Sequence, residues 1–300
     1  MWKNIRKNWE LYLFVLPAFA AILIFAYVPL YGIQIAFRHF NPTLGFMGSP
    51  WVGFEHFRNF FNSFFFWPIL WNTVLLSLYD LLWGFPVPII LALFLNQTRS
   101  MRFRKTVQMV TYAPYFISTV VVVSMIMIFL DPSVGIVNNA IGLFGGETVR
   151  FMERPDMFRS IFVVSNIWQG AGWSTIIYLA ALSGVSTELH EAAIADGASK
   201  VKRIWHIDLP GIIPTIVIML ILRSGQILNI GFERVLLMQN PLNLPVSNII
   251  ATHVYEMGVA GILPLPDYAT AIGLFNSVIN FVILFGVNII AKRVSETSLW

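Results

Sequence analysis

Six long apolar segments constrain this sequence more than any other feature. A helix needs about 20 mostly apolar residues to cross the hydrocarbon core of a bilayer, and each segment reaches or nearly reaches that length. The six segments cover residues 11–37, 68–96, 107–130, 160–182, 211–238 and 269–291. Only 11% of the chain is charged, against roughly 25% in soluble domains, so water could not solvate its surface. We therefore predict an all-α membrane protein with six transmembrane helices.

The positively charged residues indicate how these segments cross the membrane. Lys and Arg gather before the first segment and in three later stretches, residues 99–105, 200–203 and 292–293. Loops rich in Lys and Arg stay on the cytoplasmic side of a membrane, so both termini are predicted to be cytoplasmic. Residues 1–10 and 292–300 would then flank a membrane domain at 11–291.

The fifth segment is less regular, because Arg223 and Gln226 interrupt its apolar run. Omitting this span would move Lys292 and Arg293 to the outer face, against the same charge rule, so we keep six spans. The connections on the outer side combine Phe, Trp, Pro and Gly, and we expect ordered caps there, partly at the membrane interface. They cover residues 38–67, 131–159 and 239–268.

Composition and charge exclude several classes of protein. The 19 Lys and Arg residues lie in short clusters between apolar segments and do not form the single basic patch of a nucleic-acid binder. The sequence has no cysteine, which excludes disulfides and thiolate chemistry. No lysine follows a glycine, as a phosphate-binding loop would require. A separate subunit would therefore have to bind and hydrolyse any ATP.

The loop predicted between the fourth and fifth spans, residues 184–210, carries the clearest motif. Glu191 lies near the start of a predicted helix, where the helix dipole favours negative charge. Gly197 is positioned to end this helix in a left-handed conformation, and Ser199 is positioned to cap a second helix. Pro210 is predicted to mark the boundary with the fifth span. Because the first helix has a shallow face of small alanines, we expect it to fit a groove of a partner protein.

This loop resembles the EAA signature of permeases of ATP-binding cassette (ABC) importers. The resemblance rests on Glu191-Ala-Ala, then Gly197 after three residues, then Ile207-Asp-Leu-Pro210 after nine more. Further runs resemble the carbohydrate-uptake branch of these permeases. They include Pro29-Leu-Tyr-Gly32, Tyr112-Ala-Pro-Tyr-Phe-Ile-Ser118 and Ser298-Leu-Trp300. Within that branch, the sequence is similar to permeases for complex or oligomeric sugars, often named for lipoproteins or polysaccharides.

The resemblance implies a type I importer permease fold and a mechanism of alternating access. Such a permease works beside a second permease subunit, in this branch a different chain. The pair is docked on two cytoplasmic ATPases, which bind ATP and Mg²⁺. An external solute-binding protein delivers the carbohydrate, and the permeases pass it across the bacterial cell membrane. The resemblance implies no catalytic residue and no cofactor in the chain itself.

By the same resemblance, the EAA loop docks on an ATPase. The implied docking residues are Glu191, Ala192, Ala193, Asp196, Gly197 and Ala198. Leu209 and Pro210 would fix the angle between this element and the membrane. Movement of the ATPases would then pass to the spans as rigid-body motion.

Polar side chains inside the predicted spans are candidates for the substrate path, because they are costly in lipid and usually face a cavity or one another. Asn166 and Gln169 are three residues apart and share a helix face, and the fifth span repeats this spacing. Amides beside aromatic rings suit sugar hydroxyls and C–H faces. The candidates are Asn166, Trp168, Gln169, Trp173, Gln226, Asn229 and Tyr115. The alternative role for the amides is hydrogen bonding between helices, worth about 0.6 kcal/mol on average.

Three charged residues also lie within predicted spans, namely Asp80, Arg223 and Glu233. Asp80 and Arg223 each fall near the middle of a span, at about 1.5 Å of rise per residue. They could pair with each other near the translocation path, or each could be solvated or bonded to an amide separately. The sequence leaves both arrangements open.

Other kinds of protein are weighed as alternatives. An ion-coupled secondary carrier or a channel would need no ATPase, but carriers often have inverted repeats, and none is visible here. A membrane-embedded enzyme is disfavoured, because no nucleophile, base and orienting group can be assembled. His190-Glu191 begins like the zinc motif H-E-x-x-H, but Ile194 stands in the place of the second histidine. Because no histidine lies in a predicted span, we also expect no metal site.

Overall fold

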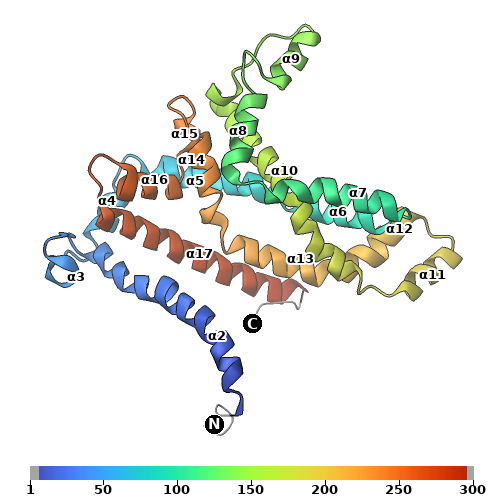
Figure 1. Cartoon of the computed structure of the whole chain (residues 1–300), viewed down its shortest axis with the longest axis horizontal. Helices are drawn as coiled ribbons and strands as arrows, with labels where there is room; N and C mark the ends of the chain where they lie inside the picture. The colour runs from blue at the N-terminus through green and yellow to red at the C-terminus, as the bar shows by residue number, and fades with distance from the viewer. Residues whose placement is uncertain (1–6, 296–300) are drawn as a thin grey trace. The chain divides into compact units, whose positions relative to one another are not determined.

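The computed structural model describes residues 7–295 (Figure 1). In this range the fold is helical throughout, and the one strand-like feature is an isolated bridge between Arg38 and Trp51. The prediction of an all-α protein is therefore confirmed for these residues. The outermost parts of the two predicted cytoplasmic ends, residues 1–6 and 296–300, lie outside the described residues, and so does the Ser298-Leu-Trp300 run.

The described chain contains α-helices of very different lengths, joined by shorter π and 3₁₀ turns. The α-helices are α2 (Trp9–Ile22), α3 (Gly45–Gly48), α4 (Glu55–Phe61), α5 (Phe66–Tyr79), α6 (Pro86–Asn96), α7 (Met101–Tyr112), α8 (Thr119–Phe129), α9 (Ile136–Leu143), α10 (Pro155–Leu182), α11 (Thr187–Ala195), α12 (Lys200–Arg203), α13 (Leu209–Ser224), α14 (Phe232–Met238), α15 (Leu244–Ser247), α16 (Ile250–Tyr255) and α17 (Pro266–Ser295). The π turns are η1 (Leu23–Tyr27), η3 (Asp80–Gly84), η6 (Ile204–Asp208) and η8 (Glu256–Ala260). The 3₁₀ turns are η2 (Val28–Phe37), η4 (Ala113–Phe116), η5 (Phe151–Glu153) and η7 (Ile227–Asn229).

Four or five stretches of the described chain are long and apolar enough to cross a membrane. The four continuous ones are Trp9–Phe37, Phe66–Asn96, Lys200–Ser224 and Pro266–Arg293. The fifth is the pair Met101–Phe116 and Thr119–Phe129, whose two helices are bent by 103°. The predicted fourth span lies within α10, which has 28 residues but is interspersed with amides and glycines. Length and apolarity alone therefore support a multi-pass membrane protein with fewer spans than the six predicted.

The prediction of one helix at 107–130 is wrong, because the chain bends sharply within it. A bend of 103° separates α7 and the 3₁₀ turn η4 from α8. Ser118 starts the new helix, since its side chain accepts a hydrogen bond from the backbone N–H of Val121 at 3.4 Å. The bend leaves Ile117 outside both helices, so its carbonyl oxygen is available to a side-chain donor.

The predicted span 211–238 and its boundary at Pro210 are also wrong. One helical stretch runs from Lys200 through η6 and α13 to Ser224, so it begins before the predicted boundary. It is followed by a loop that ends at Gly231, the residue before α14. Gly231 has a φ of 46°, a left-handed conformation that residues with side chains rarely adopt. The chain therefore reaches α14 by a break in the helix.

Pro210 is accommodated by a π turn, and the same device occurs in two other membrane stretches. The π turn η6 ends two residues before Pro210, η3 ends two residues before Pro86, and η1 ends two residues before Pro29. Proline lacks an N–H, and its ring clashes with the carbonyl group four residues earlier in an α-helix. A π turn closes i→i+5 hydrogen bonds and so moves that carbonyl group away from the ring. These prolines can therefore lie within a helical stretch without ending it.

The chain forms two compact units, which are described separately. One consists of the chain up to Phe66 together with Val254–Phe275, and the other consists of Trp67–His253 together with the chain from Asn276 onward. The first unit contains α2, α3, α4 and the start of α17. The second unit contains α6 to α15 and the polar cavities described below.

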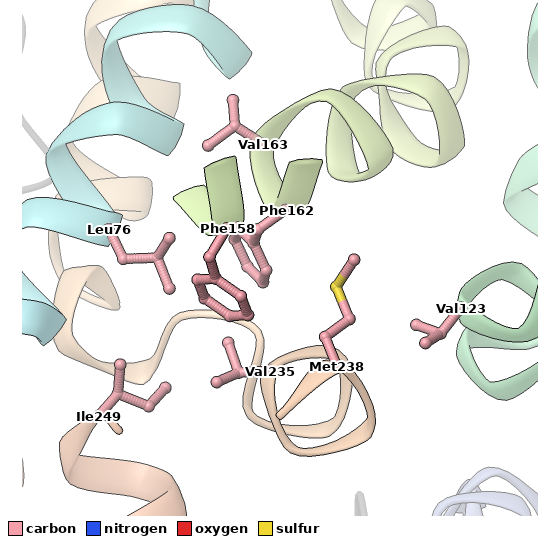
Figure 2. Close-up of a cluster of buried hydrophobic side chains, with 8 residues drawn as sticks. All are labelled: Leu76, Val123, Phe158, Phe162, Val163, Val235, Met238 and Ile249. Atoms are coloured by element: carbon pink, nitrogen blue, oxygen red, sulfur yellow. The ribbon is translucent and has the colours of Figure 1, made fainter. Parts of the chain in front are cut away.

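The hydrophobic core of the second unit is centred on α10 (Figure 2). One cluster consists of Leu76, Val123, Phe158, Phe162, Val163, Val235, Met238 and Ile249. A second cluster joins α6, α10 and α13, and consists of Ile89, Ala92, Leu93, Leu95, Tyr178, Leu179, Leu182 and Ile212. Because α10 is surrounded by other helices, its polar side chains can find partners within the protein. This explains why α10 is less apolar than the other long helices.

Gly172 lets α10 approach α7 closely, and this contact gives a first prediction. A Cβ atom at Gly172 would lie 2.0 Å from the carbonyl oxygen of Thr111. We expect Gly172→Ala to lower the free energy of unfolding by about 1–3 kcal/mol, the usual cost of overpacking, and to lower the Tm of the purified protein. Gly170→Ala is the matched control, because a Cβ atom there meets nothing within 4 Å. An equal loss of stability in both variants would contradict the close helix contact.

Candidate functional site

The two interruptions in the helices of the second unit meet at a polar cavity of about 680 Å³. It is bounded by η4 and the bend after it, by α10, and by the loop before α14. Five of the candidate residues line it, namely Tyr115, Asn166, Gln169, Asn229 and Glu233. Two smaller cavities, of about 210 and 230 Å³, share Asn166 with it. Non-helical backbone inside a membrane protein is tolerated where it lines such a cavity, and it often marks a transport site.

Asp80 and Arg223 form an ion pair at the wall of the 210 Å³ cavity. Nη2 of Arg223 lies 2.5 Å from Oδ2 of Asp80. The sequence left open whether these two residues pair with each other or are solvated separately, and in the structure they pair. Nδ2 of Asn166 donates to Oδ1 of Asp80, also at 2.5 Å. A Cβ atom on Gly84 would lie only 3.0 Å from Nη2 of Arg223, so this glycine makes room for the guanidinium. Asp80 is 5% exposed, and both of its oxygens have partners, as a buried carboxylate requires.

Arg234 is a site residue that the sequence analysis did not single out. It is buried in α14, at 5% exposed, and lines the 680 Å³ cavity. Its Nη1 donates to Oγ of Ser165 at 2.8 Å, and its Nη2 donates to Oε1 of Gln169. Nε2 of Gln169 donates in turn to the carbonyl oxygen of Ile117 at 2.7 Å. Gln169 thus links α14 to the bend between α7 and α8.

No carboxylate forms an ion pair with Arg234 in the part of the chain that the structure describes, although Asp80 and Glu233 lie near enough to attract its charge. Its contacts are a hydroxyl and an amide, and none of the ion pairs among residues 7–295 includes it. The sequence did carry a signal, since an arginine inside a predicted span is costly and commonly faces a cavity. A buried cation at a cavity wall is available to an anionic ligand.

The remaining candidates are divided among three cavities. Tyr115 stacks on Trp173, with ring centroids 4.7 Å apart and planes inclined by 5°, and forms an aromatic surface beside the polar cavity. Gln226 lines the 210 Å³ cavity, and Asn229 lines both this cavity and the large one. Trp168 lies apart from them, in an apolar cavity of about 470 Å³ between α8 and α10. The structure therefore gathers the predicted amides together but separates Trp168 from them.

The EAA loop has the local structure that its sequence predicts. The hydroxyl of Ser186 caps α11, and Gly197 ends it with a φ of 75°. Ser199 then accepts a hydrogen bond from the backbone N–H of Lys202 at 3.4 Å and caps α12. The predicted docking residues Glu191, Ala192, Asp196 and Gly197 are exposed, and Ala193 and Ala198 are half-buried. Leu209 and Pro210 begin α13 directly after η6.

Asp208, which lies in the Ile207-Asp-Leu-Pro210 run of the motif, joins this loop to the neighbouring helices, a role that was not predicted from the sequence. Its side chain is fully buried. Nδ2 of Asn96 donates to Oδ1 at 3.1 Å, and Nε2 of Gln97 donates to Oδ2 at 2.6 Å. Nε2 of His190, in α11, lies 3.2 Å from Oδ1. Asp208 therefore connects the EAA loop to the end of α6. Asn96 and Gln97 are more than 100 residues from Asp208 in the sequence, so no local sequence pattern predicts the contact.

Comparison with known proteins defines the class of this chain. A model of the family described as binding-protein-dependent transport system inner membrane component matches residues 70–296, and the chain belongs to this family. It is therefore a permease subunit of an ABC importer, a multi-pass membrane component of a transport system and not an enzyme.

Individual relatives cover almost the whole chain. Protein LplB of Bacillus subtilis is 44% identical over 98% of this chain and 92% of that protein. The polygalacturonan/rhamnogalacturonan transport system permease protein YteP of the same organism is 42% identical over 97% of this chain and 90% of that protein. A crystal structure of a bacterial alginate ABC transporter, in complex with an alginate pentasaccharide-bound periplasmic protein, contains a chain that is 40% identical. The two folds match with a TM-score of 0.90 over 100% of this chain and 99% of that chain.

These findings confirm the prediction of an ABC importer permease with a type I fold. The alternative of an ion-coupled carrier or channel has no support among these relatives.

Proposed function

We propose that this permease passes acidic oligosaccharides across the cell membrane. The observation that carries the proposal is the buried Arg234 in the wall of the 680 Å³ cavity, which lacks a direct carboxylate partner among the described residues. A guanidinium presents two parallel N–H donors that match the two oxygens of a carboxylate. Sugars of the uronic acid type carry such a carboxylate. The relatives named for alginate and polygalacturonan support this substrate class, because both polymers are built from uronic acids.

The other polar groups of the cavity suit the rest of a sugar ring. Asn166, Gln169 and Asn229 each make hydrogen bonds to other segments of the protein. Their remaining N–H groups and lone pairs can bind sugar hydroxyls, and the Tyr115–Trp173 pair can cover a C–H face. Gln226, Glu233 and the Asp80–Arg223 pair would border the path. Trp168 is not part of this proposed path, because its cavity is apolar and separate.

The transport assembly that we propose follows the family. The chain would work beside a second, different permease on two ATPases that bind ATP and Mg²⁺, and an external binding protein would deliver the sugar. Six spans would be reached with α10 as the fourth and with Lys200–Ser224 plus α14 as the fifth. Both ends of the 11–291 membrane domain would then be cytoplasmic, in line with the positions of Lys and Arg.

In this assembly the exposed face of α11 would dock on an ATPase. Ala192 and Ala193 present small side chains, and Gly197 fixes the turn that follows. Leu209 and Pro210 would set the angle between this element and the membrane stretch that follows. Closure of the ATPases would move the loop and switch the cavity between its outward-facing and inward-facing forms.

Transport by reconstituted protein tests the proposal. The complete transporter with its binding protein is placed in liposomes, and uptake of uronic acid oligosaccharides is compared with that of neutral oligosaccharides of equal length. We expect uptake that needs ATP and that favours the acidic series. Uptake driven by an ion gradient without ATP, or a preference for the neutral series, would contradict the proposal.

Arg234 provides the residue-level prediction. Replacing it with glutamine removes the charge, and because a hydrogen bond to a charged group is worth about 1.5–3 kcal/mol, we expect uptake of acidic oligosaccharides to fall about tenfold or more. Arg234→Lys should retain an intermediate rate, since it keeps the charge but loses the two parallel donors. Arg150→Gln, at an exposed arginine, is the control. Equal rates in the Arg234→Gln variant and the unaltered protein would exclude a role in substrate binding.

A further inference from the structure

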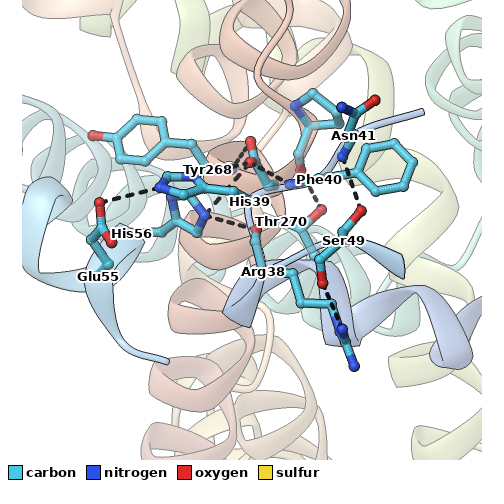
Figure 3. Close-up of polar contacts among 11 residues, drawn as sticks. Arg38, His39, Phe40, Asn41, Ser49, Glu55, His56, Tyr268 and Thr270 are labelled. Carbon is cyan, nitrogen blue, oxygen red and sulfur yellow. Dashed lines mark hydrogen bonds and ion pairs between the residues drawn. The ribbon is translucent and has the colours of Figure 1, made fainter. Parts of the chain in front are cut away.

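Three side chains of the kinds that bind metals converge in the first unit, apart from the cavities. His39 follows η2, His56 lies in the first turn of α4, and Asp267 lies in the first turn of α17. Their candidate ligand atoms all lie within 4.8 Å of one another. His56 and Asp267 are buried, at 4% and 8% exposed, whereas His39 is open to solvent. Figure 3 shows that the rings of His39 and His56 lie close together and that Glu55 lies beside them.

The distances within this cluster fit metal ligands better than hydrogen bonds. Nε2 of His56 lies 3.6 Å from Oδ2 of Asp267, and Nδ1 of His39 lies 3.9 Å from the same oxygen. Hydrogen bonds between nitrogen and oxygen are about 2.7–3.2 Å long, so neither contact is one. Ligand atoms bound tetrahedrally to Zn²⁺ at about 2.0–2.2 Å are about 3.4 Å apart. The two separations from Oδ2 of Asp267 exceed this spacing by about 0.5 Å and 0.2 Å (3.9 and 3.6 Å against 3.4 Å).

The surroundings of the cluster hold these side chains in orientations that suit metal binding. Oε1 of Glu55 lies 3.4 Å from Nε2 of His39, slightly beyond hydrogen-bond length, so a carboxylate stands beside the ring nitrogen that is not the nearer one to Asp267. A carboxylate that accepts the other ring N–H is the usual support of a metal-bound histidine. Asp267 is fixed by two backbone N–H groups, those of Phe40 at 3.0 Å and Tyr268 at 2.9 Å.

We propose that His39, His56 and Asp267 form a binding site for a divalent transition metal, with Zn²⁺ as the ion that two imidazoles and one carboxylate suit best. Water would occupy the fourth position. Nε2 of His56 donates a hydrogen bond to the carbonyl oxygen of Arg38 at 3.0 Å, so on metal binding this bond would break and the proton would move through solvent to Nδ1 of the same ring. The ion would clamp the segment after η2 and the start of α4 to the first turn of α17. No metal site was expected from the sequence, because the His190-Glu191 motif is incomplete and no histidine lies in a predicted span. These ligands come from three separate segments outside the spans.

Zinc binding to the complete transporter tests this site. The purified assembly is stripped with EDTA, titrated with ZnCl₂ and analysed for bound zinc and for Tm. We expect His39→Gln to lose one zinc per copy of this chain and to lose the rise in Tm that zinc causes. Because His39 is exposed, this variant should still fold, which size-exclusion chromatography can verify. Glu55→Gln keeps the three ligands and should weaken zinc affinity about 10- to 100-fold, as expected for loss of an outer partner.

The matched control is His206→Gln, which removes an exposed histidine whose ring contacts only the carbonyl oxygen of Lys202 among the hydrogen bonds described. This variant should bind as much zinc as the unaltered protein. The proposal is overturned if His39→Gln retains the full zinc content, or if His206→Gln loses as much. It is equally overturned if the unaltered protein binds no zinc and its Tm changes only with pH, since the cluster would then bind protons instead.

Discussion

Replacing Asp80 with alanine is expected to abolish transport and to lower the free energy of unfolding by about 1–3 kcal/mol, the cost of leaving polar groups without their partner when the arginine side chain is still 34% exposed. The change leaves the guanidinium of Arg223 without its carboxylate and the amide of Asn166 without its acceptor. Thermal unfolding of the purified protein and ATP-dependent uptake in liposomes measure the two effects. The control Asp156→Ala removes a carboxylate that is exposed and paired only at the surface, and it should change neither quantity appreciably.

The charge exchange separates pairing from other roles of these residues. Asp80→Arg combined with Arg223→Asp restores one positive and one negative charge and should recover part of the transport that each single change removes. Full recovery is not expected, because Asp80 is 5% exposed and Gly84 leaves little room for a longer side chain. A double variant that is no better than the single variants would show that the ion pair does not account for their loss.

Replacing Asp208 with alanine is the second change with a large expected effect, in this case on coupling. The substitution removes two hydrogen bonds to a charged carboxylate, at about 1.5 kcal/mol or more each, and breaks the connection between α11 and the end of α6. The EAA loop could then move without moving the membrane helices. We expect sugar uptake per ATP hydrolysed to fall about tenfold or more, while the protein still inserts into the membrane.

Measuring uptake and ATP hydrolysis in the same liposomes distinguishes uncoupling from loss of folding. An uncoupled variant hydrolyses ATP but transports little, whereas an unfolded variant does neither. The conservative change Asp208→Asn keeps one acceptor oxygen and should lie between the two extremes. A normal ratio of uptake to hydrolysis in Asp208→Ala would remove Asp208 from the coupling path.

The features that the sequence predicted correctly are those fixed by local chemistry. The apolar segments predicted a helical membrane protein, and Gly197 and Ser199 predicted the stop and the restart in the EAA loop, because turn and cap preferences depend on a few neighbouring residues. The bend at Ser118 was missed because the apolar run continues across it. The break before Gly231 was missed because the interruption at Arg223 and Gln226 was kept within a single span. The roles of Arg234 and Asp208 were missed because their partners lie on other helices.

The candidate cavity was predicted only in part for the same reason. The spacing of Asn166 and Gln169 indicated a shared face of α10, and both residues do line the cavity. The spacing could not distinguish Trp168, which is close in sequence but turned toward α8. Which side of a helix meets a cavity depends on how neighbouring helices pack, and that arrangement is a property of the tertiary structure.

The π turns before Pro29, Pro86 and Pro210 have a consequence for anyone who aligns or redesigns these helices. Successive residues of an α-helix are rotated by about 100°, so one additional residue in a turn rotates everything beyond it by about that angle. A single helical wheel drawn through any of these three stretches would thus assign its second half to the wrong side. Replacing the proline and also deleting one residue from the turn would keep the following side chains closer to their original directions than replacing the proline alone.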